Sequence, residues 1–88
     1  MRPANPIHPG KMLLEEFLIP GGISQREIAR RLGWTVAKTN ELINGKRGVT
    51  ADSALDLAAE LGTSPEVWLS LQMQFDLNRA ELRRRRAS

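Results

Sequence analysis

The chain contains no cysteine and only one histidine, His8, and both scarcities limit the chemistry it can perform. Without cysteine there is no disulfide and no thiol nucleophile, and without a second imidazole we expect no transition-metal site. His8 lies in the segment PIHPG, which is typical of a turn or a helix entry. The carboxylates fall on helical faces that periodicity places in solvent, and no nucleophile accompanies them. The sequence therefore predicts no enzyme, no metal and no cofactor.

Aromatic residues are also scarce, and no apolar run is long enough to cross a bilayer. The N-terminus carries no cleavable signal pattern. The 88 residues, 41% of them hydrophobic, suit one small helical domain that gains stability from a partner or a second copy. These features predict a globular cytoplasmic protein that does not associate with membranes.

Two short capped helical patterns lie between Ser24 and Arg47 and are joined through Leu32-Gly33-Trp34. Ser24 can cap the first helix, and Glu27 can reach back to the Ser24 amide to complete a capping box. Thr35 can cap the second helix. A supporting helix, a glycine turn and a second helix with a polar outer face together form a helix-turn-helix, which places its second helix in the major groove of DNA.

Helical periodicity divides the second, recognition helix (residues 35–44) into two faces. Thr39, Leu42 and Ile43 are expected to face the supporting helix, and Val36 turns partly inward. The outward face is expected to carry Ala37, Lys38, Asn40, Glu41 and Asn44. On periodicity alone, an ordinary helical hairpin with solvated charges remains an alternative.

Basic and acidic residues are unevenly distributed along the chain, although the formal net charge is only +3. Residues 23–48 hold six basic and two acidic residues, a net charge of +4, whereas residues 49–78 hold five acidic and no basic residues. The last ten residues hold five arginines and one glutamate. A basic window attracts phosphate, and an acidic one is repelled by DNA and should face another partner. The alternative is that both windows are solvated faces.

Two further helices are predicted on either side of this motif. One opens at Pro9-Gly10 and ends at Pro20-Gly21-Gly22, and the other is capped by Thr50 and closed by Gly62. The buried stripe of the first is expected to be Leu13, Leu14, Phe17 and Leu18. The inward residues of the second are expected to be Ala51, Ala54, Leu55, Ala58 and Leu61.

A fifth helix starts at Ser64-Pro65-Glu66, runs toward the arginines, and is apolar on more than one side. Large apolar patches mark interfaces, so the excess predicts a homodimer; the alternative is that all of it wraps one core. The predicted dimer residues are Leu69, Met73, Phe75 and Leu77. We divide the chain into a flexible segment (1–7), the domain with its dimerisation helix (8–82) and a basic tail (83–88). The run Arg83–Arg86 is either a mobile solvated tail or a further phosphate contact.

Nearly the whole chain resembles the HigA family of addiction-module antitoxins, within the xenobiotic-response-element type of helix-turn-helix proteins. The residues that carry the resemblance are His8-Pro9-Gly10, LLEEFL at 13–18, Ser24-Gln25, Ile28-Ala29, Leu32-Gly33, Asn40-Glu41, Asn44-Gly45-Lys46-Arg47, Thr50-Ala51-Asp52, Ala54-Leu55, LGTS at 61–64, Trp68-Leu69, Leu71-Gln72 and Asp76-Leu77. The resemblance implies an all-α, five-helix, lambda-repressor-like domain. It also implies a dimer that binds operator DNA, represses its own operon and neutralises a HigB-like toxin, a ribosome-associated messenger-RNA endonuclease.

The resemblance also assigns roles to residues of the motif. It implies that Gln25 contacts phosphate and that Thr35 makes the contact at the start of the recognition helix. The implied base-reading residues are Val36, Ala37, Lys38, Asn40 and Glu41, and the implied backbone clamp is Asn44, Lys46 and Arg47. Lysine can donate to guanine, asparagine can pair with adenine and glutamate can accept from cytosine, so the chemistry is suitable.

Two residues depart from the family pattern, because Trp34 stands where a smaller aliphatic residue is usual and Thr39 replaces a larger buried one. The indole could fill the space beside Thr39. Two other functions remain open: a stand-alone phage-repressor-like regulator without a toxin, and an adaptor that has kept the fold and lost DNA binding. The operator and its half-site spacing do not follow from the sequence.

Overall fold

The computed structural model describes residues 6–87, and all of the regular secondary structure within them is helical, as the sequence predicted. The first helix is one continuous stretch made of α1 (Pro9–Met12), a π-helical segment η1 (Leu13–Leu18) and α2 (Ile19–Gly21). The other four helices are α3 (Gln25–Leu32), α4 (Val36–Ile43), α5 (Ala51–Leu61) and α6 (Pro65–Ala87). The expected flexibility of residues 1–7 falls mostly on residues 1–5, which lie outside the described residues.

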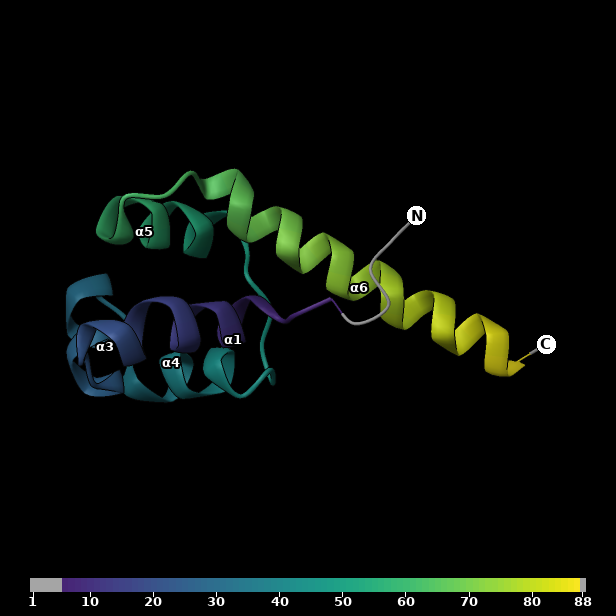
Figure 1. The fold of residues 1–88 in the computed structure, drawn as a ribbon, viewed down its shortest axis with the longest axis horizontal. Coiled ribbons are helices and arrows are strands. Elements are labelled where there is room, and N and C mark those ends of the chain that lie inside the picture. Colours follow the sequence, from purple (N-terminus) through teal and green to yellow (C-terminus); the bar gives the residue numbers. More distant parts are fainter. Residues whose placement is uncertain (1–5, 88) are drawn as a thin grey trace.

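The helices form a small bundle from which one end of α6 extends. Figure 1 shows α1, α3 and α4 together on one side, with α5 and the first turns of α6 covering them. The yellow C-terminal part of α6 continues beyond the bundle. Arg83–Arg86 are exposed and lie within this helix, so α6 runs into the arginines as the sequence predicted.

Side-chain caps start the helices where the sequence placed them. Ser24 Oγ accepts from the Glu27 amide at 3.0 Å, and Thr35 Oγ1 accepts from the Lys38 amide at 3.0 Å. Thr50 caps α5 in the same way, with a donor–acceptor distance of 3.2 Å. Between α3 and α4, Gly33 adopts the left-handed conformation (φ 71°) that closes one helix tightly before the next.

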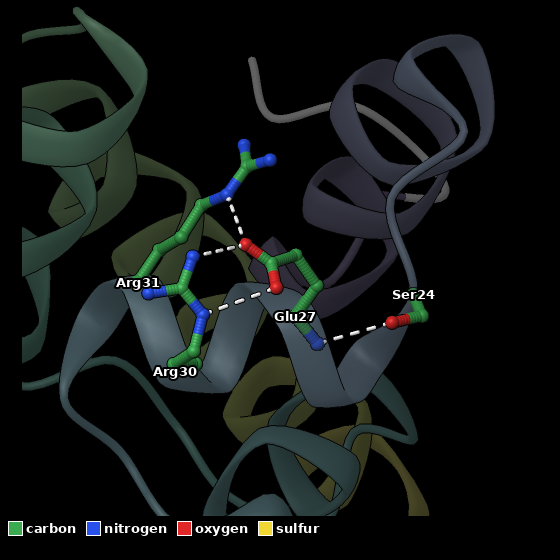
Figure 2. Close-up of polar contacts among 4 residues, drawn as sticks. All are labelled: Ser24, Glu27, Arg30 and Arg31. Carbon is green, nitrogen blue, oxygen red and sulfur yellow. Dashed lines mark hydrogen bonds and ion pairs between the residues drawn. The ribbon is translucent and has the colours of Figure 1, made fainter.

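The second half of the predicted capping box is wrong. The carboxylate of Glu27 accepts from the guanidinium groups of Arg30 and Arg31, one turn further along α3, rather than from the Ser24 amide (Figure 2). These hydrogen bonds, first from Arg30 and then from Arg31, lower the pKa of Glu27 to about 2. Charged guanidinium donors bind a carboxylate more strongly than a backbone amide does, which explains the choice.

The core is closed mainly by fully buried side chains from every helix: Leu13, Leu18, Ile28, Leu42, Leu57 and Trp68. On α5 the predicted inward face is partly wrong, because Leu55 is 57% exposed and Ala51 is also exposed, while Leu57 is fully buried. Both leucines fit an apolar helical stripe with Ala54. The packing of α3 and α6 against α5 selects the side that carries Leu57.

The π-helical segment was not foreseen from the sequence. Its wider turn, closed by the hydrogen bond from the Ile19 amide to the Leu14 carbonyl, brings residues five apart closer to one face. In a regular α-helix such residues point about 140° apart. Leu13 and Leu18 are therefore both buried in the same core.

The backbones of α1 and α4 touch at Gly10. A Cβ atom on Gly10 would lie 1.8 Å from the carbonyl oxygen of Leu42, so no side chain fits between the two helices. This contact fixes the position of α4, the recognition helix, against the first helix of the bundle.

Candidate DNA-binding surface

The outer face of α4 is open over the residues that the structure describes. Val36 is 47% exposed, and Ala37, Asn40 and Asn44 are also exposed. The inward residues Thr39, Leu42 and Ile43 are buried, as periodicity predicted. Val36, the first helical residue after the Thr35 cap, is turned outward more than periodicity indicated.

Three amide side chains connect the two helices of the motif. The Asn40 amide donates to Gln25 Oε1 at 3.1 Å, and the Asn44 amide donates to Asn40 Oδ1 at 3.1 Å. The chain Gln25–Asn40–Asn44 therefore crosses from the start of α3 to the end of α4 along the exposed surface. It gathers one predicted phosphate contact, one predicted base reader and one clamp residue.

The predicted base reader Glu41 and the predicted clamp residue Arg47 bind each other. Arg47 donates to Glu41 Oε1 from two nitrogens, at 3.2 and 2.8 Å. Both side chains are 46% exposed, and an exposed pair of this kind stabilises the fold by at most about 1 kcal/mol. A phosphate can therefore displace Glu41 from Arg47 at small cost.

The clamp loop, residues 44–49, is held from both sides. The Lys46 amide donates to the Glu41 carbonyl at 2.8 Å, which folds the loop back on α4. From α6, Gln72 Oε1 accepts from the Val49 amide at 2.8 Å, and the Gln72 amide donates to Asp76 at 2.9 Å. Sequence reasoning missed Gln72 as a support for this loop, because nothing in a helical pattern indicates a partner 23 residues away.

His8 joins the first helix to the clamp loop and to α6. Its Nδ1 accepts from the Gly10 amide at 3.0 Å and caps α1, which confirms the predicted helix-entry role. The edge of its ring meets Phe75, with 4.8 Å between ring centroids. Burial lowers the pKa of His8, opposed by the charge of Asp76 and a hydrogen bond to the Arg47 backbone; the charge of Arg79 lowers it slightly further.

We expect the free energy of unfolding to decrease as the pH is lowered below neutral, because of His8. Its folded-state pKa lies below the ordinary 6.5, so the unfolded chain takes up the proton first. The stabilisation that neutral His8 gives to the folded state is complete above the unfolded-state pKa of about 6.5. It is lost as pH falls from there through the lower folded-state pKa. His8→Asn supplies a capping oxygen in place of Nδ1 and removes the titration, so its urea midpoint should change less than that of the parent between about pH 7.5 and about pH 5.5. Parallel changes in the two proteins would contradict the assignment.

Trp34 and Lys38 lie against each other at the start of α4. The Lys38 ammonium is 4.3 Å from the centroid of the Trp34 ring. The indole nitrogen donates to Asp56 Oδ2 on α5 at 2.9 Å, so the indole extends toward α5. The Thr39 hydroxyl, at the position where a larger residue is usual, donates to the Thr35 carbonyl at 3.0 Å.

Two arginines of the basic window are paired on α3 rather than placed on α4. Arg30 and Arg31 are paired with Glu27, and the charge of Glu60 on α5 contributes to raising the pKa of Arg30. These two arginines of the basic window are therefore occupied with Glu27 on α3.

On α6, three of the four predicted dimer residues are exposed. Leu69, Met73 and Leu77 are 38%, 51% and 37% exposed and follow one another at intervals of four residues. Phe75 instead packs within the chain, between His8 and the guanidinium of Arg79, which lies 5.5 Å from its ring centroid. Leu69, Met73 and Leu77 are therefore the predicted dimer residues that lie on the exposed surface.

Residues 14–68 match the helix-turn-helix family. The chain is 45% identical to antitoxin HigA-1 of Vibrio cholerae over 73 residues, which are 82% of this chain and 68% of that protein. None of the described helices combines the length and the apolar composition needed to cross a membrane.

Two solved structures have the same fold. Antitoxin GraA is 46% identical, with a TM-score of 0.86 over 94% of this chain and 86% of GraA. The Pseudomonas aeruginosa antitoxin HigA, solved with the higBA promoter, is 34% identical, with a TM-score of 0.89 over 94% of this chain and 90% of that one. These relatives are helix-turn-helix antitoxins and not enzymes, which confirms the prediction of a non-enzymatic protein. The chain therefore belongs to the helix-turn-helix family and, within it, to the HigA antitoxins.

Proposed function

We propose that this protein is the antitoxin of a type II toxin–antitoxin module and acts in the cytoplasm. In this proposal a homodimer binds operator DNA, represses its own operon and neutralises a HigB-like messenger-RNA endonuclease.

The main support is the open polar face of α4 with a basic loop beside it. Asn40 and Asn44 lie on that face, and Lys46 and Arg47 extend from the loop at its end. A related antitoxin of the same fold has been solved with promoter DNA. A recognition helix that enters the major groove needs both elements, because base contacts specify the sequence and phosphate contacts fix the register.

Each side chain of the surface has a suitable partner on DNA. Asn40 can pair with adenine, Lys38 with guanine and Glu41 with cytosine. The apolar side chains of Val36 and Ala37 fit a thymine methyl group. We assign phosphate contacts to Gln25, Thr35, Asn44, Lys46 and Arg47. If Arg47 exchanges Glu41 for a phosphate, the same step frees Glu41 for a base.

Removing the two charges of the loop tests the DNA-binding part of the proposal. We expect Lys46→Ala with Arg47→Ala to weaken binding on all duplexes alike and to reduce the slope of log affinity against log salt by about 1.8, or 0.9 for each lost phosphate contact. The measurement is fluorescence anisotropy with duplexes taken from upstream of the gene, over a series of salt concentrations.

Arg30→Ala with Arg31→Ala is the matched control, because it removes the same charge from residues of α3 that are paired with Glu27. Its salt slope should remain close to that of the parent. Equal losses in the two double variants would mean that binding depends on net charge and would contradict the assigned surface.

Toxin binding is supported by charge. The acidic residues of the 49–78 window lie mainly on α5 and α6, and a toxin that handles RNA is expected to be basic, so the two surfaces would be complementary. Co-expression with the neighbouring reading frame tests this part. A complex and relief of growth arrest are expected. If neither is seen while operator binding persists, the protein is a stand-alone regulator.

A further inference from the structure

Both the backbone and the side-chain end of Lys38 make contacts at the start of α4. Its backbone amide donates to the Thr35 cap at 3.0 Å, and its ammonium lies 4.3 Å from the Trp34 ring centroid. The residue is half-buried, whereas Ala37 before it and Asn40 two positions after it are exposed. Its side chain is therefore confined to one edge of α4, near the end that enters the groove.

The indole that holds Lys38 is itself tethered. Trp34 follows the turn glycine, and its Nε1 donates to Asp56 Oδ2 at 2.9 Å, a bond that joins the helix-turn-helix to α5. The ring is half-buried against the core. One edge of the ring is held by an acceptor from another helix, and a cation lies over its face, which is the arrangement of a cation–π contact.

We propose that Trp34 is a specificity-determining positioning residue: its indole, tethered to Asp56, holds the Lys38 ammonium in one place, from which Lys38 recognises a single operator position. This inference rests on the proposed DNA-binding function. A lysine whose four-carbon side chain moves freely can contact any nearby acceptor, whether a phosphate or one of several bases. It therefore discriminates little between base pairs. A lysine held against a ring has lost much of that freedom before it meets DNA, and its preferred partner is the guanine edge that presents two acceptors at that position.

The test begins with a duplex that the parent protein selects from a randomised pool, and with single-base-pair variants of that duplex. The parent is expected to discriminate by about 5- to 150-fold at the position that Lys38 contacts. Trp34→Leu removes the ring face, and we expect it to lower discrimination at that one position by about 2- to 30-fold. Discrimination at the position contacted by Asn40 should stay unchanged.

Further variants separate positioning from a general structural effect. Asp56→Ala should reproduce the loss seen in Trp34→Leu, and Asp56→Asn, which retains an acceptor oxygen, should restore most of the discrimination. Lys38→Ala should remove discrimination at the same position. Adding Trp34→Leu to Lys38→Ala should cause no further loss there, because Trp34 acts through Lys38.

Three results would overturn the inference. The first is an equal loss of affinity for all duplexes in Trp34→Leu, which would indicate a structural role only. The second is a change of discrimination in Trp34→Leu at a position that Lys38→Ala leaves untouched. The third is a parent protein that selects no duplex at all, which would also end the proposed function; in the first two cases that function stands.

Discussion

Replacing Gly10 by alanine is expected to lower the free energy of unfolding by at least about 3 kcal/mol, the upper part of the range for an overpacked core. The new Cβ would lie 1.8 Å from the Leu42 carbonyl oxygen, which is backbone and cannot move aside without shifting α4. Alanine otherwise favours a helix over glycine, so the loss would occur against the intrinsic propensity. Urea unfolding followed by circular dichroism measures it.

Gly21→Ala is the control for this substitution. Its Cβ would lie 3.1 Å from Cδ1 of Ile23, the end of a side chain that can give way. We expect a change within about 1 kcal/mol. If Gly10→Ala were as mild as Gly21→Ala, the direct backbone contact between α1 and α4 would be refuted. Because that contact sets the position of the recognition helix, Gly10→Ala protein that still folds should also bind operator DNA more weakly.

Placing charges on the exposed stripe of α6, formed by Leu69, Met73 and Leu77, is expected to prevent the proposed dimer from forming. Met73→Glu with Leu77→Glu would set four carboxylates into an apolar contact between two copies, and buried unpaired charges are strongly unfavourable. The variant should sediment as a monomer. Its affinity for a duplex with two half-sites should fall by about 10²- to 10⁴-fold, because the second half-site no longer binds as part of the same molecule.

Binding to a duplex with one half-site should change little in this variant, which distinguishes loss of the dimer from damage to α4. Leu55→Glu is the matched control, since Leu55 is 57% exposed on α5 and lies outside the proposed contact. A double variant that stays dimeric at the same concentration as the parent would place the interface elsewhere.

Much of the candidate site could be predicted from local sequence. Ser24 and Thr35 are caps because a hydroxyl there accepts from an amide three residues on, and that geometry needs no distant residue. The turn at Gly33 and the buried side of α4 follow from backbone conformation and helical period. The exposed positions of Ala37, Asn40 and Asn44 follow in turn from the buried ones.

Other features depend on which groups compete for the same partner. Glu27 could bind the Ser24 amide or two arginines, and Leu55 and Leu57 could each face the core. The sequence pattern is equally compatible with both alternatives in each case. The outcome is set by charge-assisted hydrogen bonds in the first case and by the direction from which α3 and α6 approach α5 in the second.

Local residue order was thus sufficient for the order of the helices, for their hydroxyl caps and for the exposed face of α4, because each depends on groups within about one helical turn. The supports of that helix come from distant parts of the chain: Gln72 beneath the clamp loop, Asp56 behind Trp34, and the backbone of Leu42 against Gly10. Hydrogen bonds and close contacts between such residues exist only once the helices have packed. For this reason the folded structure, and not the pattern of residues, assigns the orientation of Lys38 and the pairing of Arg47.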